Sequence, residues 1–509
     1  MKNILGIELG STRIKSVLID ENGKVLANGS YHWENKLVNG HWSYSMDEVR
    51  CGLQISYKEL VKDYGYPIET LDAIGISAMM HGYLAFDEKW NLLEPFRTWR
   101  DTTTAQAADI LTKELQFNMP QRWSATHYFQ AVLNKEKTVK EIAHLQTLAG
   151  YVHYLLTGKN VLGANDASGM FPIDGKSWDK ERIEKYDALL SKYGVNANLT
   201  DLLPQVLLAG ENAGRLTESG AWYLDPTGTL KAGAAMCPPE GDMGTGMICT
   251  NSLRPTTGHV SSGTTANMSV VLEKPFKNYY RQIDIIATPD GYPCALIHTN
   301  NCTSEIDQWV NLFDEVIKLS GGNIDKDKLY TELFNKSAES DSDVGKLVGY
   351  NYLSGEPLAE TAKGAPMIIR PQDGKLNLAN FMQMQVYSAV AALSLGTDIL
   401  KNEGVKISSV TAHGGYYKTS KIGQIATSAA LGAPVTVMST AGEGGAYGIA
   451  LLAGYVLIND ISLQDYLDSI FSNDDNVTFS ANETEKAKYN AFITNYKRYL
   501  VSEQTASKV

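Results

Sequence analysis

Cysteine and long apolar runs are both scarce in this sequence. The five cysteines form no Cys-x-x-Cys pair and stand at scattered positions: Cys51, Cys237, Cys249, Cys294 and Cys302. This odd, scattered set excludes a disulfide framework and a zinc knuckle, and it indicates reduced thiols in a cytoplasmic protein. The longest apolar stretch, residues 444–458, has about 15 residues, fewer than the roughly 20 that cross a bilayer. We therefore expect a buried helix there and no membrane partner.

Basic residues are also in short supply. Lys and Arg number 45 against 57 Asp and Glu, which gives a net charge of -12. An acidic surface repels phosphate backbones, so a nucleic acid partner is not expected, although a local basic pocket for a nucleotide is compatible with this charge. Hydrophobic residues make up 43% and charged residues 20% of the 509 positions. These values are typical of a globular protein with sizeable cores, organised as two large domains or three to four smaller ones.

A short pattern near the N-terminus recurs about half a chain later. Gly10-Ser11-Thr12 and the segment Ser16 to Ile19 correspond to Gly263-Thr264-Thr265 and residues 269–272 at a constant spacing of 253 positions. Each copy is typical of a strand, a tight turn and a second strand. Chance similarity between two such segments is one explanation. The other is a pair of similar domains, which we place at residues 1–253 and 254–509.

Strand patterns alternate with helix patterns along both halves, which predicts an α/β fold with mostly parallel sheets. Asn22-Gly23 predicts a two-residue hairpin turn. Asn482 is the expected N-cap of the last helix. The predicted strands are residues 71–78, 83–86, 229–237, 405–412 and 434–437, and the predicted helices are residues 102–115, 137–156, 179–192, 421–431, 445–457 and 483–501.

The two glycine-hydroxyl turns are candidate phosphate sites. Glycine lets an anion approach the backbone closely, and successive N–H groups on a turn form a nest for phosphate oxygens. Two such nests, one in each domain, could hold a polyphosphate from both sides of a cleft. The alternative is that both are ordinary hairpin turns.

Asp242 is the candidate general base. It follows the stop at Pro238-Pro239 and precedes a run of small residues, where a helix can begin close to a sheet. A simple helix cap and a solvated loop charge are the structural alternatives. At the mouth of a phosphate-binding cleft, however, a carboxylate can accept a proton from an attacking hydroxyl and help to hold Mg²⁺.

These segments together resemble the FGGY carbohydrate kinases, which belong to the actin, hexokinase and Hsp70 superfamily. The resemblance covers nearly the whole chain and follows the order of the family's motifs. The matching segments are Gly6 to Thr12 with Lys15, Gly241-Asp242, Gly263-Thr264-Thr265, and His413-Gly414-Gly415 with residues 424–426 and 431–435. Smaller matches are Met79-Met80-His81-Gly82, Trp99-Arg100-Asp101, Asp166 to Gly169, and Tyr352 to Glu356.

The resemblance implies two actin-like (ribonuclease H-like) domains with an ATP cleft between them. The N-terminal domain would carry the sugar site, the first phosphate loop and the catalytic aspartate, and the C-terminal domain the second phosphate loop and the adenosine site. Implied contacts to ATP come from Gly10, Ser11, Thr12, Lys15, Gly263, Thr264, Thr265, Gly414 and Gly415. Implied contacts to the sugar come from Met80, His81, Trp99, Asp101 and Asp242, and implied contacts to Mg²⁺ from Glu8 and Asp242. Asp242 is the implied catalytic residue. A solvated Lys15 and a core His81 are the alternatives at those positions.

Met80-His81 is similar to the segment that xylulose kinases use against their ketopentose, so the expected reaction is phosphorylation of a ketopentose such as xylulose. Ribulose, gluconate, glycerol or another polyol are alternative substrates. Departures from the family pattern lie mainly on the sugar side: Glu8 replaces Asp, Met243 replaces Asn or Gln, Arg100 replaces Asn, and Pro357 replaces Arg. A non-catalytic sugar sensor and an ATP-driven conformational machine are rival functions. The sequence leaves open whether the protein forms a homodimer.

Overall fold

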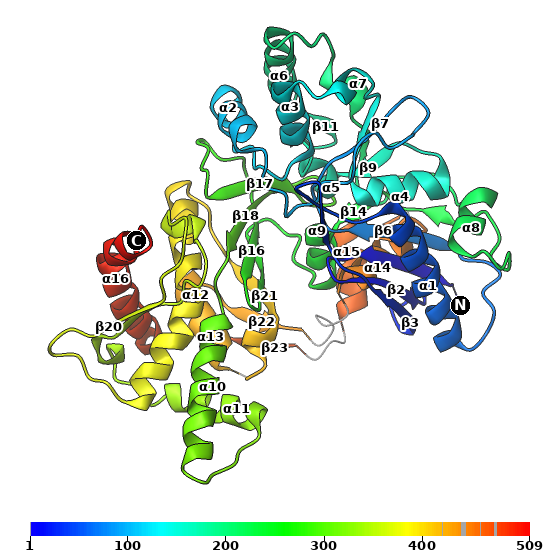
Figure 1. Cartoon of the computed structure of the whole chain (residues 1–509). Coiled ribbons are helices and arrows are strands. Elements are labelled where there is room, and N and C mark those ends of the chain that lie inside the picture. Colours follow the sequence, from blue (N-terminus) through cyan, green and yellow to red (C-terminus); the bar gives the residue numbers. More distant parts are fainter. Residues whose placement is uncertain (1, 420, 439–443, 459, 473–475) are drawn as a thin grey trace.

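Two β-sheets organise the molecule, one in each half of the chain (Figure 1). The computed structural model describes residues 2–419, 421–438, 444–458, 460–472 and 476–509. The first sheet has the strand order β13-β6-β1-β2-β3, with β14 also paired to β6. Its strands are β1 (Ile4–Leu9), β2 (Arg13–Ile19), β3 (Val25–His32), β6 (Ala73–Ala78), β13 (Ala235–Met236) and β14 (Glu240–Gly241).

The second sheet has the order β17-β18-β16-β15-β21-β22-β23. Its strands are β15 (Thr257–Ser262), β16 (Ala266–Val271), β17 (Ile283–Ala287), β18 (Pro293–Thr299), β21 (Ser409–His413), β22 (Val435–Val437) and β23 (Val477–Phe479). Short two-stranded ribbons complete the strands: β4 (Lys36–Val38) with β5 (His41–Ser43), β7 (Leu84–Phe86) with β8 (His144–Gln146), β9 (Val161–Gly163) with β12 (Gln205–Leu207), β10 (Ile173–Asp174) with β11 (Ser177–Trp178), and β19 (Val348–Tyr350) with β20 (Met367–Ile369).

The two sheets share one pattern of strand directions. In the first, β3, β2 and β1 are antiparallel neighbours and β1 runs parallel to β6. In the second, β18, β16 and β15 are antiparallel neighbours and β15 runs parallel to β21. The half-length repeat therefore reflects a repeated topology, and the expected actin-like fold is confirmed. In each sheet the repeated segment is the turn between the two antiparallel strands, β1–β2 and β15–β16.

Helices cover both sheets, and each sheet with its helices is called a lobe below (Figure 1). They are α1 (Met46–Tyr64), α2 (Ala105–Leu115), α3 (Ser124–Asn134), α4 (Leu148–Thr157), α5 (Ala164–Ser168), α6 (Lys180–Lys192), α7 (Leu199–Leu202), α8 (Glu218–Leu224), α9 (Asp242–Cys249), α10 (Ser304–Leu319), α11 (Lys326–Ser337), α12 (Leu378–Asn402), α13 (Ile422–Leu431), α14 (Gly445–Tyr455), α15 (Leu463–Phe471) and α16 (Glu483–Ala506). As expected, the side chain of Asn482 caps α16, and it does so within a capping box.

Three local predictions are wrong. The helix predicted over residues 137–156 is a 3-10 turn, the strand β8 and then α4, because pairing with β7 buries Leu145 completely. The Asn22-Gly23 turn is a longer connection, since β2 ends at Ile19 and β3 begins at Val25. The strand predicted over residues 229–237 shortens to β13.

Helix α14 lies in the second half of the sequence but packs on the first sheet, against β1, β6 and α9. The approach is so close that a Cβ at Gly6 would lie 2.0 Å from the carbonyl oxygen of Ala446. The apolar stretch at residues 444–458 therefore contains a buried helix, as expected. The boundary between residues 253 and 254 stays a prediction.

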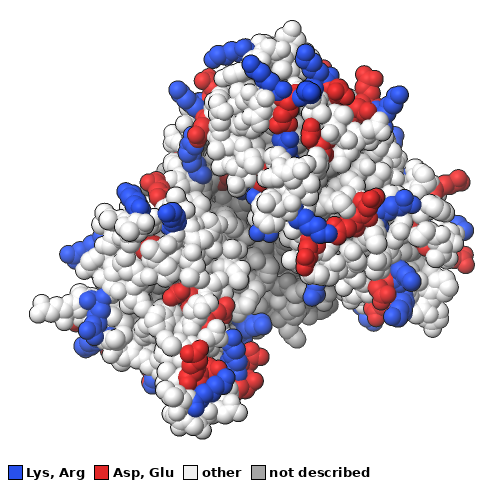
Figure 2. Space-filling view, viewed as in Figure 1, with Lys and Arg blue, Asp and Glu red and all other residues white. Residues whose placement is uncertain are grey.

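The described part of the chain contains no helix that is both long and apolar enough to span a bilayer. Positive and negative side chains are interspersed on the face in Figure 2, and the surface is hollowed between the two lobes.

Candidate active site

Three strand ends of the first sheet place the candidate residues at one edge. Leu9 of β1 and Gly241 of β14 both pair with Ala78, the last residue of β6. The turn at residues 10–12, the Met80-His81 segment and Asp242 follow these strand ends directly. Because the carboxyl ends of parallel strands meet at the same edge of a sheet, the expected sugar, phosphate and acid groups lie together there.

Asp242 begins helix α9, and its Oδ1 accepts a hydrogen bond from the N–H of Met80 at 3.2 Å. Burial raises the pKa of its carboxyl to about 6, even though backbone N–H groups that bond to the charged form oppose this shift. A carboxylate with a pKa near neutrality holds a proton transiently, which is what general base catalysis needs. The alternative of a plain helix cap is wrong, because Gly241 is the N-cap of α9 and no side chain makes the capping hydrogen bond.

Glu8 lies on β1 beside the start of α14. Its carboxylate accepts hydrogen bonds from the N–H groups of Ala446 and Gly445, so it caps that helix. Burial, with a further contribution from the charge of Asp242, raises the pKa of Glu8 to about 7, while Lys15 opposes the shift. Two neighbouring carboxylates that desolvation makes costly to ionise suit a Mg²⁺ ion, which prefers oxygen ligands. The described residues contain no group of three or more His, Cys, Asp or Glu side chains that could hold a metal ion.

His81 is buried and has a backbone φ of 70°, which is unusual for a residue with a side chain. Its Nδ1 lies 3.2 Å from the carbonyl oxygen of Gly169 and, since a carbonyl only accepts, Nδ1 carries the proton. Burial, together with the charge of Arg122, lowers the pKa of the ring well below its usual value. A neutral His81 therefore keeps Nε2 as a hydrogen-bond acceptor. This geometry supports a ligand contact over a simple core role.

Two residues near His81 were missed in the sequence. The indole ring of Trp123 lies nearly parallel to the His81 ring, with 6.2 Å between centroids, and its buried Nε1 has no hydrogen-bond partner among the described residues. Arg122 forms an ion pair with Asp284 of β17 in the other lobe. Neither residue belongs to a periodic pattern or a glycine-rich segment, so no sequence signal separated them from their neighbours.

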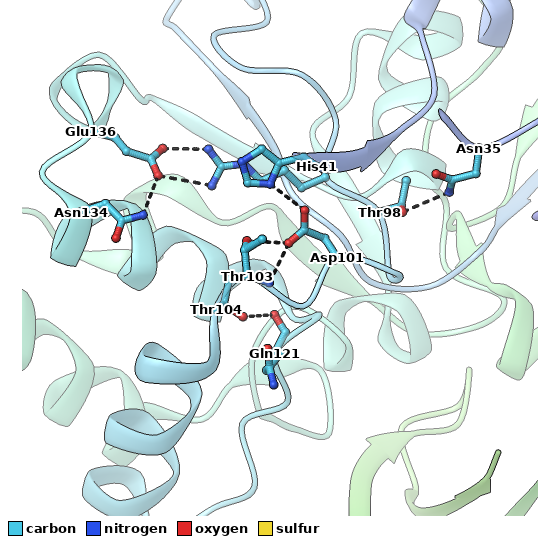
Figure 3. Close-up of polar contacts among 10 residues, drawn as sticks. Asn35, His41, Thr98, Asp101, Thr103, Thr104, Gln121, Asn134 and Glu136 are labelled. Carbon is cyan, nitrogen blue, oxygen red and sulfur yellow. Dashed lines mark hydrogen bonds and ion pairs between the residues drawn. The ribbon is translucent and has the colours of Figure 1, made fainter. Parts of the chain in front are cut away.

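Trp99 contacts the first turn, whereas Asp101 bonds to residues outside it. No hydrogen bond, ion pair or ring contact within the described part of the chain joins either residue to His81 or Asp242. The indole N–H of Trp99 donates to Oγ of Ser11 at 3.2 Å. Asp101 is buried, and its carboxylate accepts from Nδ1 of His41 at 2.6 Å and from the N–H and hydroxyl of Thr103 (Figure 3). These bonds hold the pKa of Asp101 below its usual value despite burial.

The second turn and the glycines of the expected adenosine site lie together. Gly414 follows β21, which pairs with β15, and has a φ of 110°. A Cβ at Gly414 would lie 2.1 Å from the carbonyl oxygen of Ser262, the residue before the turn at residues 263–265. Only glycine allows this approach at that backbone angle.

Helix α9 connects the two sheets. On one side, the hydroxyl of Thr245 lies 3.1 Å from that of Ser77 on β6. On the other side, a Cβ at Gly246 would lie 3.7 Å from the ring of His259 on β15. The helix that begins with Asp242 is therefore flanked by the strands that lead to both sets of site residues.

Comparisons with known proteins agree with this arrangement. The FGGY family of carbohydrate kinases matches through its N-terminal domain at residues 3–226 and its C-terminal domain at residues 258–457. The chain belongs to this family. It is therefore a carbohydrate kinase with two α/β domains of the actin-like type.

Individual relatives do not agree on one substrate. The chain is 23% identical to a xylulose kinase from Haemophilus influenzae over 434 residues, which is 82% of this chain and 83% of that protein. It resembles the solved gluconate kinase from Lactobacillus acidophilus with a TM-score of 0.80 and 16% identity over 99% of both chains. It resembles the xylulose kinase from Rhodospirillum rubrum with a TM-score of 0.78 and 13% identity over the full length of both. At these identities the structural likeness shows the fold alone.

Proposed function

We propose that this FGGY kinase transfers the γ-phosphoryl group of ATP to a hydroxyl of a small ketose, with a ketopentose such as xylulose as the preferred substrate. The observation that carries the proposal is the position of Asp242. This carboxylate lies at the edge shared by the first glycine-hydroxyl turn and the His81 segment, and burial raises its pKa to about 6.

Asp242 accepts the proton of the sugar hydroxyl while that oxygen attacks the γ-phosphorus. The turns at residues 10–12 and 263–265 and the side chain of Lys15 contact the phosphates, and Gly414 and Gly415 contact the adenosine. Phosphoryl transfer needs little covalent help from a protein, so positioning and charge stabilisation supply most of the acceleration. Water is a competing acceptor, and closure of the lobes over the bound sugar would exclude it.

Glu8 and Asp242 would hold Mg²⁺, which offsets the negative charge of the phosphate oxygens when bound. The raised pKa values of both carboxyls fit this role. Their charged forms are costly because they are buried, and a bound cation would compensate this cost by its attraction. Glu8 also caps α14, so its replacement is expected to affect both the metal and the helix.

A neutral ketose fits the sugar side better than an aldonate does. The charge of Arg122 acts on His81, and this charge is already paired with Asp284. A carboxylate ligand would have to compete with Asp284 for that cation, in a site that already holds Asp242. Hydroxyl groups, by contrast, can donate to Nε2 of His81 and accept from Nε1 of Trp123. This charge balance and the relative from Haemophilus influenzae support xylulose over gluconate.

The test is a coupled ADP-release assay with Mg²⁺ and ATP over xylulose, ribulose, gluconate and glycerol, with product mass measured in parallel. We expect sugar-dependent ADP release with the highest kcat/KM for a ketopentose, and a product that is heavier than the sugar by one phosphate. Preference for gluconate would contradict the substrate assignment. ADP release that is independent of any sugar would favour an ATP-driven conformational machine, and sugar binding without product would favour a sensor.

A further inference from the structure

The carbonyl oxygens of Gly10, Ser11 and Thr12 in the first phosphate turn all accept hydrogen bonds from other parts of the protein. Nε1 of Trp33 donates to the carbonyl of Gly10 at 2.7 Å, and the hydroxyl of Tyr44 donates to the carbonyl of Ser11 at 2.6 Å. The backbone N–H of Trp33 donates to the carbonyl of Thr12 at 3.2 Å. The amide N–H groups of Ser11 and Thr12 donate to no other group among the described residues.

Two of the donors support each other. The rings of Trp33 and Tyr44 are stacked, with centroids 4.1 Å apart and an interplanar angle of 24°. Both side chains are buried, so their positions are fixed by packing. A carbonyl that is held on one side of a turn keeps the neighbouring amide N–H groups on the other side, where a phosphate can accept from them.

A third aromatic side chain reaches the turn from outside. Trp99 is 40% exposed, yet its indole N–H donates to Oγ of Ser11. Since that contact uses the serine oxygen as acceptor, the serine hydroxyl keeps its own proton for a phosphate oxygen. The bonds from Asp101 to His41 and to Thr103 fix the segment two residues after Trp99 (Figure 3).

The second phosphate turn is held in the same way by different groups. The carbonyl of Gly263 accepts from the N–H of Thr303 at 3.0 Å and from its hydroxyl at 2.8 Å. The carbonyl of Thr264 accepts from the N–H of Cys302 at 2.9 Å. Both turns therefore have their acceptors occupied from within the protein, but only the first depends on aromatic side chains that a substitution can remove one at a time.

We propose that Trp33, Tyr44 and Trp99 form an aromatic bracket that positions the turn at residues 10–12 for the phosphates of the nucleotide. The three are positioning residues, and the inference rests on the proposed use of ATP. It gives the Trp99-Arg100-Asp101 segment a role in orienting ATP, separate from the sugar contact that the family resemblance implies. Loss of one bracket bond frees one carbonyl, and the peptide units of the turn then sample orientations that point their N–H groups away from the phosphate.

Tyr44→Phe is the sharpest test, because it removes only the hydroxyl and keeps the ring stacked on Trp33. A matched control is Tyr186→Phe, since the buried hydroxyl of Tyr186 donates to the carbonyl of Ala125 at 2.7 Å away from the turn. The net worth of one such bond corresponds to a roughly 2- to 10-fold effect. We expect Tyr44→Phe to raise the Kd for Mg-ATP, measured by calorimetry without sugar, by that factor and to raise the ATP KM, while the sugar KM stays unchanged. Tyr186→Phe should leave both constants unchanged.

The inference is overturned if Tyr44→Phe binds Mg-ATP as tightly as the parent, or if it changes the sugar KM as much as the ATP KM. Trp99→Phe gives a second readout: a rise in the ATP KM alone supports the bracket, and a rise in the sugar KM alone removes Trp99 from it. The calorimetric measurement of Mg-ATP binding distinguishes failure of the proposed function from failure of the aromatic bracket. A parent protein that binds no Mg-ATP refutes the proposed function, whereas a parent that binds it and a variant that binds it equally well refute only the bracket.

Discussion

Replacing Asp242 by Asn should abolish turnover and at the same time stabilise the folded protein. Asn keeps the size of the side chain and an oxygen that can accept from the N–H of Met80, but it cannot take a proton from a sugar hydroxyl. General base catalysis commonly contributes about 10² to 10⁴ in rate. We expect turnover to fall by about 10³ or more, which is on the order of 4 kcal/mol of barrier, while Mg-ATP still binds.

The gain in stability follows from the pKa of Asp242. Folding raises this pKa from 3.8 to about 6, so the folded state disfavours the charge. A shift of about two units corresponds to roughly 3 kcal/mol at pH 8, and this is an upper bound because Asn cannot replace every acceptor of the carboxylate. For a group whose pKa is raised, stability is complete below the unfolded pKa and is lost as the pH rises through the folded pKa. The advantage of the variant should therefore halve by about pH 5 and vanish below about pH 4.

The assay is thermal unfolding of both proteins without ligand at pH 8 and pH 5, beside a steady-state rate measurement. At roughly 2 °C per kcal/mol, the scale for a domain of about 250 residues, the advantage at pH 8 is at most about 6 °C in Tm. Equal Tm values at pH 8 would mean that Asp242 is not desolvated as its surroundings indicate. A variant that keeps a tenth of the normal rate would refute its role as the base.

Further predictions concern the sugar side, the pH profile and one glycine. His81→Ala should raise the sugar KM much more than the ATP KM, and equal effects on both constants in steady-state assays would place His81 outside the sugar site. The value of kcat/KM for the sugar should fall about tenfold per pH unit below pH 6, because Asp242 works as a base only when it is deprotonated; a profile flat down to pH 5 would contradict this. Gly241→Ala should lower both kcat and Tm, because the added Cβ would lie 2.1 Å from Cγ of Met80. Gly65→Ala, where a Cβ meets no neighbour, is a control for kcat only, because its φ of 79° strains the backbone and lowers Tm by itself.

The sequence pointed to those parts of the candidate site that depend on local chemistry. The turns at residues 10–12 and 263–265 are visible because glycine and hydroxyl residues interrupt strands, and Asp242 is visible because a carboxylate stands between a proline stop and a run of small residues. The half-length repeat predicted a repeated topology, since both copies form the turn of the same antiparallel pair.

Contacts between distant segments left no such pattern. The side chains of Trp33 and Tyr44 each donate one hydrogen bond to a backbone carbonyl of the first turn. Arg122 forms its ion pair with Asp284 in the other lobe. Likewise, the strand pairing that buries Leu145 overrides the helical pattern around it. The crossing of α14 onto the first sheet depends on glycines that admit a helix backbone, and the packing of two elements some 440 positions apart is not encoded in either one alone.

The most direct test of the central claim follows the phosphoryl group itself. ATP labelled at its γ-phosphorus is incubated with the protein, Mg²⁺ and xylulose, and the label is traced by chromatography. The account predicts that the label appears in a sugar phosphate, in amounts equal to the ADP formed, and that Asp242→Asn forms this product about 10³-fold more slowly or slower still. Label found only in inorganic phosphate, at a rate that does not depend on the sugar, would contradict it.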